Sequence, residues 1–202
     1  MTDHLPDWRV PPYLIPQEKE ELVAQLRDLP NLDGRKFYSS GPAGEDTVFQ
    51  GDGFLQFTFI DLLSSATKIG KAFVISNTCD LSPENERVLP INLMYAPLAP
   101  LRGFESALRT QQSGKADSVL SAIRKNQYTH ILYLPEIPGQ LDESIVRLDM
   151  VHNIPPTFLY SKDDWKSLRL FSLSNFGIYT TILKLSIHFH RLQEGVSRSH
   201  RV

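Results

Sequence analysis

The densest group of side chains that could do chemistry is the run Ser76-Asn77-Thr78-Cys79-Asp80, which contains the only cysteine of the chain. Cys79 beside Asp80 could act as a nucleophile next to an acid, with His130 or His152 as the base. A thiol becomes reactive only beside a histidine or a helix N-terminus. The alternative is therefore a small buried side chain at a strand end, with Asp80 capping the turn that follows.

Three polar side chains of this run alternate along the end of a predicted strand: Ser76, Thr78 and Asp80. Successive residues of a strand point to opposite faces, so we expect these three to share one face. With Cys79 beside them, they could bind a phosphate, a ribose or a peptide backbone.

A second candidate is the basic stretch 103–127, which reads as two short helices around Ser113-Gly114. Its two acids, Glu105 and Asp117, oppose five cations in or next to it, namely Arg102, Arg109, Lys115, Arg124 and Lys125. Of these, Arg109, Arg124 and Lys125 are the candidate phosphate contacts. The alternative is a solvated helical insertion between strands.

The composition excludes several classes of protein. The chain has 202 residues, a formal net charge of -2 and a pI of about 6.3, so no global attraction to nucleic acid or membrane follows. One cysteine excludes an internal disulfide and a multi-cysteine zinc site. His188 and His190 lie two apart on a predicted helix, where they do not readily chelate one metal. We expect no metal and no cofactor.

The start of the chain lacks the basic and apolar stretches of a signal peptide, and no apolar run approaches the roughly 18 residues of a membrane span. We therefore expect a cytoplasmic protein that does not contact membranes.

The elements that must position these residues are mostly strands. Residues 51–98 read as a meander of three strands, and the run AFVIS is apolar enough for a strand buried on both faces. Strands return at 128–154. Helical patterns cover Gln17–Leu29 and Trp165–Glu194, the second with a possible break at Gly177.

In order, a strand opened by Gly51-Asp52-Gly53-Phe54, the buried strand AFVIS, a strand ending in YAPL, a later strand LDMVHNI and a C-terminal helix resemble the MazF/PemK toxin family. That family consists of SH3-like β-barrels that cleave single-stranded RNA and pair with antitoxins. The resemblance implies an α+β fold: a small SH3-like barrel with an N-terminal helix, an inserted helical hairpin and a C-terminal helix. It also implies a homodimer.

Two positions depart from the pattern of the family. Its second strand opens with Arg-Pro, where this chain has Lys71-Ala72, and its third strand ends in Pro-aliphatic-Thr, where this chain has Pro97-Leu98-Ala99. Lysine carries charge but lacks the bidentate fork of arginine, so it replaces arginine poorly on a phosphate. The departures favour a binding module that has lost the hydrolytic groups.

The hypotheses are as follows. The chain binds RNA, or an antitoxin or other protein partner, through the barrel groove in a bacterial toxin–antitoxin or defence setting. Alternatively it is an active metal-independent endoribonuclease, with Lys71 on the phosphate and Asp80 or His152 as general base. A third alternative is a hydrolase that depends on Cys79. The expected organisation is an N-terminal arm, helix and loop (1–50), the barrel with its insertion and C-terminal helix (51–194) and a basic tail (195–202).

Overall fold

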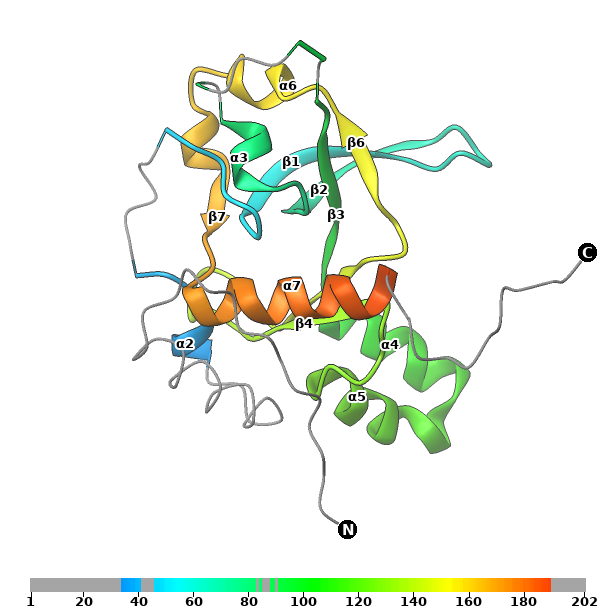
Figure 1. Ribbon diagram of the computed structural model, residues 1–202. Helices are drawn as coiled ribbons and strands as arrows, with labels where there is room; N and C mark the ends of the chain where they lie inside the picture. The colour runs from blue at the N-terminus through cyan, green and yellow to red at the C-terminus, as the bar shows by residue number, and fades with distance from the viewer. Residues whose placement is uncertain (1–33, 41–45, 83, 85–87, 90, 190–202) are drawn as a thin grey trace, which may run out of the picture.

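The computed structural model describes residues 34–40, 46–82, 84, 88–89 and 91–189 (Figure 1). The predicted helix Gln17–Leu29 and the basic tail 195–202 lie outside these residues. The described chain is α+β, as predicted, and its centre is a seven-stranded antiparallel sheet. The strands are β1 (Gly53–Ile60), β2 (Thr67–Val74), β3 (Leu93–Pro100), β4 (Ile131–Leu134), β5 (Ser144–Arg147), β6 (His152–Ile154) and β7 (Arg169–Phe171).

The strand order is β4-β5-β3-β2-β1-β7, and β6 pairs with β3 beyond the segment that pairs with β5. The first three strands form the meander predicted from residues 51–98. Within the described residues no ladder joins β4 to β7, so the sheet is open. The outer half of the β1–β2 hairpin extends away from the body of the molecule (Figure 1).

The end of β2, residues 72–74, is buried on both faces, as the run AFVIS predicted. Ala72 and Val74 belong to one apolar core, while Phe73 belongs to a second core on the other face of the sheet. The second core also contains Phe176 of α7 (Asn175–Phe189), so this helix covers that face. A third core lies beneath the helical insertion and includes Leu120.

The predicted insertion is present as α4 (Leu101–Gln111), the 3-10 turn η2 (Ser113–Lys115) and α5 (Ala116–Arg124). Shorter helices are α2 (Gly34–Phe37), α3 (Thr78–Leu81) and α6 (Thr157–Tyr160), with a 3-10 turn η3 (Trp165–Leu168) before β7.

The Gly-Asp-Gly opening of β1 has a packing role. A Cβ on Gly53 would lie 2.4 Å from the ring of Phe171, so only glycine lets β7 approach here. Asp52 is fully buried and pairs with Arg169 of β7 at 3.2 Å, and it also accepts the backbone N–H of Phe49. The opening of β1 and the edge strand β7 are therefore joined by a buried ion pair.

Two local predictions were wrong. The stretch from Trp165 is not one helical pattern, because it forms η3 and β7 before α7 begins at Asn175. Gly177 does not break α7. A Cβ at this position would lie 2.2 Å from the carbonyl oxygen of Phe37, so Gly177 permits close contact with α2.

Candidate functional site

The run Ser76–Asp80 does not form the predicted strand end. Asn77 caps the helical turn α3, and its side chain accepts the backbone N–H of Cys79 at 2.9 Å. Ser76 is buried, and its hydroxyl accepts the backbone N–H of Met94 at 2.7 Å. The prediction that Ser76, Thr78 and Asp80 share one face of a strand is therefore wrong. The side chain of Asn77 caps a helical turn, so the backbone leaves the strand conformation at this point.

The remaining side chains of this run take structural roles where their contacts are described. The hydroxyl of Thr78 accepts the backbone N–H of Gln50 at 3.0 Å, which holds the loop before β1. Cys79 is exposed, in contrast to the buried alternative. Asp80 lies in the first turn of α3.

Lys71 and His152 project from opposite faces of the sheet. Directly paired residues of antiparallel strands share a face. Lys71 pairs with Leu98, a member of the core under α7, whereas His152 pairs with Tyr95, a member of the opposite core. These two predicted catalytic residues therefore do not converge on one substrate.

His152 lies in an aromatic cluster, which we call the aromatic shelf: Phe59, Tyr95 and His152. The imidazole stacks on Tyr95 with ring centroids 5.7 Å apart and meets the edge of Phe59 at 5.3 Å. Phe59 pairs with the exposed Lys68, so one cation lies on the same face. Burial raises the pKa of Tyr95, whose hydroxyl donates to the Thr58 carbonyl. The shelf is an apolar surface with one adjacent cation.

The structure brings three predicted insertion residues together. Arg109, Arg124 and Lys125 line one cavity of about 370 Å³ between α4 and α5. Both arginines are already paired with acids. Arg109 binds Glu105 at 2.7 Å and Asp117 at 2.9 Å.

Arg124 donates two hydrogen bonds to Glu143, at 2.8 and 2.9 Å, and the Tyr133 hydroxyl donates to the same carboxylate at 2.5 Å. The hydrogen bonds from Arg124 lower the pKa of Glu143, and burial is the main cause that raises the pKa of Tyr133. At neutral pH the carboxylate is thus ionised and the phenol protonated. The ion pair is part of the structure and does not leave Arg124 available for a phosphate.

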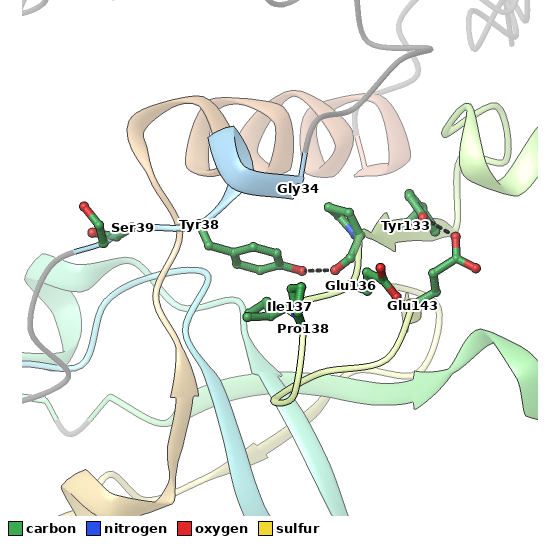
Figure 2. A pocket seen from close by; sticks show the side chains of 10 residues that line it. Gly34, Tyr38, Ser39, Tyr133, Glu136, Ile137, Pro138 and Glu143 are labelled. Atoms are coloured by element: carbon green, nitrogen blue, oxygen red, sulfur yellow. Dashed lines mark hydrogen bonds between the residues drawn. The ribbon is translucent and has the colours of Figure 1, made fainter.

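Glu143 also lines a larger pocket of about 790 Å³ (Figure 2). Its wall includes Tyr38, whose hydroxyl donates to the Pro135 carbonyl at 2.6 Å, and the acid Glu136. Burial raises the pKa of Tyr38, so this phenol is a donor and not a base. With two carboxylates and no cation among its lining residues, the pocket does not suit a phosphate.

Sequence reasoning missed this pocket, because its residues come from three stretches far apart in the chain, around 34–40, 133–138 and 143. No motif links these stretches.

Within the described part of the chain, no group of three or more His, Cys, Asp or Glu side chains could hold a metal ion. In the same residues, no helix combines the length and apolar character needed to cross a bilayer. No protein-family model matches the chain, and no curated protein matches it.

Proposed function

We propose that the chain is a divergent MazF/PemK-like binding module that acts on a protein partner and lacks the RNA hydrolysis of that family. The setting would be a cytoplasmic toxin–antitoxin or defence system, with an antitoxin or another protein as partner. In this proposal the open sheet is a divergent form of the SH3-like barrel. The antiparallel β1–β2–β3 meander supports it.

The loss of hydrolysis follows from the positions of the candidate groups. Cleavage through a 2′-hydroxyl needs a base, an acid and donors to the phosphoryl oxygens at one place. Lys71 and His152 are on opposite faces, and Ala99 supplies no hydroxyl.

One observation favours a protein partner over RNA. All five arginines whose side chains the structure describes are in ion pairs: Arg102, Arg109, Arg124, Arg147 and Arg169. RNA binding depends on cations that neutralise phosphates and release counterions. Cations already paired with carboxylates supply little of that free energy. The projecting hairpin instead exposes large apolar side chains, which is typical of a protein-binding surface.

The aromatic shelf supports a second candidate, the binding of single-stranded RNA. Bases stack on exposed aromatic rings, and Phe59 and His152 are both partly exposed next to Lys68.

The test incubates the purified chain with labelled single-stranded and structured RNA in EDTA and measures cleavage and fluorescence anisotropy. We expect no cleavage and only weak, salt-sensitive binding. Cleavage that is abolished by Lys71→Ala or His152→Ala, and retained by the exposed-lysine control Lys115→Ala, would overturn the proposal.

Tight RNA binding lost in Phe59→Ala and Lys68→Ala would establish the second candidate. In that case Lys71→Ala should have little effect, because Lys71 lies on the other face of the sheet.

A further inference from the structure

The larger pocket, which lies between α2 and the turn after β4, has the size and the wall of a small-molecule site. We call it the α2 pocket. Its volume of about 790 Å³ falls within the range of roughly 300–1,000 Å³ that is usual for such sites. Two phenol rings and three apolar side chains form much of its wall, namely Tyr38, Tyr133, Pro135, Ile137 and Pro138 (Figure 2). A ligand with an apolar body can bury that body here.

The hydrogen-bond donors on this wall are largely used within the protein. The Tyr38 hydroxyl donates to the Pro135 carbonyl at 2.6 Å, and the Tyr133 hydroxyl donates to Glu143 at 2.5 Å. The backbone N–H of Ile137 is bonded across the turn, and Pro135 has no backbone N–H. The wall therefore offers few donors to an anion, and a ligand that brings its own donors suits it better.

The two carboxylates of the α2 pocket differ in how their charge is balanced. Glu143 receives two hydrogen bonds from Arg124 and one from Tyr133, so its charge is neutralised within the protein. Glu136 is exposed, and no hydrogen bond or ion pair joins its side chain to another residue that the structure describes. The pocket thus keeps one uncompensated carboxylate beside aromatic and apolar walls.

We propose that the α2 pocket binds a monovalent organic cation, an ammonium or guanidinium group on an apolar chain, with Glu136 as its counter-ion. Hydrogen bonds between such a group and a carboxylate are stronger than bonds between neutral partners. An aromatic ring also attracts a cation that lies over its face. The head group supplies the donors that the wall lacks, and the apolar chain of the ligand packs on the wall.

A metal ion fits the α2 pocket less well than an organic cation. Calcium takes about six to eight oxygen ligands, and magnesium requires a nearly octahedral set. The pocket offers one carboxylate that is not already paired, and among the residues that the structure describes no three acidic, histidine or cysteine side chains are grouped to hold a metal. One carboxylate is sufficient for a monovalent head group.

The cation has two possible sources, which are a free small molecule and an arginine or lysine side chain of a polypeptide. Both present the same head group to Glu136, and the probes below distinguish them. This inference goes beyond the proposed function, which does not involve the α2 pocket. Its test uses neither RNA nor a partner protein, so the two can fail independently.

The experiment is an NMR titration of the uniformly ¹⁵N-labelled full chain. The probes are butylguanidinium, hexylammonium, the uncharged hexanol and the peptide acetyl-Gly-Arg-Gly-amide. We expect both cations to shift the amide signals of residues around the α2 pocket and to bind at least about tenfold more tightly than hexanol. Hexanol that binds as tightly as hexylammonium, or cations that shift no signal of the pocket at millimolar concentration, would overturn the proposal.

The peptide identifies the source of the cation. If it binds more tightly than butylguanidinium, the natural ligand is a side chain of a polypeptide, because the flanking backbone then adds contacts. If it binds equally or more weakly, the ligand is a free small molecule. Either result supports a cation site.

Substitutions at Glu136 test its role as counter-ion. Glu136→Gln keeps the shape of the side chain and removes its charge, so it should weaken hexylammonium binding at least about tenfold and leave hexanol binding unchanged. Glu136→Lys should abolish binding of both cations. The matched controls are Glu84→Gln and Glu84→Lys, since Glu84 is an exposed glutamate that does not line the pocket. Far-UV circular dichroism checks that all variants are folded. Cation binding that persists in Glu136→Lys, or is lost equally in Glu84→Lys, would overturn the assignment.

Discussion

At the scale of single residues, Lys184 has surroundings that change its charge. It is 5% exposed on the inner side of α7, and its ammonium donates to the backbone carbonyl of Asn126 at 2.5 Å. Burial lowers the pKa of Lys184 from 10.5 to about 8, because the charged form loses its hydration. The same inner side of α7 also buries Thr180 and Thr181, whose hydroxyls donate to carbonyls of their own helix.

This burial predicts a pH dependence of stability. Between pH 8 and 10.5 the unfolded chain binds more protons at Lys184 than the folded chain, so the free energy of unfolding should rise with pH in this window. Lys184→Met removes the titrating group. The difference in free energy of unfolding between wild type and variant should change by up to about 3 kcal/mol in favour of the wild type across the window. Urea denaturation at several pH values measures it, and parallel curves for the two proteins would contradict the prediction.

At the scale of elements, the contact between α2 and α7 depends on Gly177. The carbonyl of Phe37 occupies the space that a Cβ would need, at 2.2 Å. On the other side of the same contact, Phe37 is fully buried against Phe176, with ring centroids 6.0 Å apart. A helical glycine here reflects tertiary packing and not helix termination.

Gly177→Ala should therefore destabilise the protein, although alanine is the better helix former. Overpacking against a backbone atom costs about 1–3 kcal/mol, which exceeds the gain in helix propensity of about 1 kcal/mol. The matched control is Gly103→Ala in α4, where nothing lies within 4 Å of the added Cβ. That change should stabilise by up to about 1 kcal/mol. Thermal or urea unfolding measures the stability of both variants. A Gly177→Ala variant as stable as the wild type would contradict the prediction, since it would show that the close contact between α7 and α2 tolerates a Cβ.

At the scale of the whole molecule, one ion pair joins the start of β1 to β7. Asp52 and Arg169 are both almost fully buried, and Arg169 also donates to the Thr47 carbonyl at 2.6 Å. Its guanidinium lies over the rings of Phe54 and Trp165, at 5.6 and 5.4 Å. The pair thus connects the apolar core of the meander to a strand more than a hundred residues later in the chain.

Asp52→Asn should destabilise the protein by about 3–5 kcal/mol, since it leaves a buried guanidinium without its carboxylate. The double variant Asp52→Leu with Arg169→Met removes both charges and should recover most of that loss. Asp46→Asn serves as control, because Asp46 pairs with Lys166 on the surface and should change stability by no more than about 1 kcal/mol. Chemical denaturation measures all three. A loss in Asp46→Asn equal to that in Asp52→Asn would contradict this account.

Some features of the fold could be predicted because they depend on neighbouring residues. The burial of Ala72, Phe73 and Val74 on both faces of β2 follows from a continuous apolar run, and the helices of the insertion follow from local periodicity. The helical turn α3 was missed. Its cap at Asn77 competes with the strand pattern of the preceding residues, and only the backbone geometry decides between them.

The ion pairs of the candidate site could not be predicted from local sequence patterns. Counted along the chain, the basic stretch 103–127 has too few acids to neutralise its cations. In the fold, Asp142 and Glu143 arrive from the segment before β5 and pair with Arg102 and Arg124. These ion pairs form only because the sheet places β5 beside the insertion. No pattern within residues 103–127 predicts them.

By itself the sequence determined the α+β class, the strand meander and the helical insertion, because apolar periodicity and turn residues act over a few neighbouring positions. The tertiary structure alone decided three things. It set Lys71 and His152 on opposite faces of the sheet, it paired Arg102 and Arg124 with acids from the segment before β5, and it left Ile60 and Ile69 of the β1–β2 hairpin exposed. Each depends on strand register and on long-range pairing, which bring together residues that the linear order keeps apart.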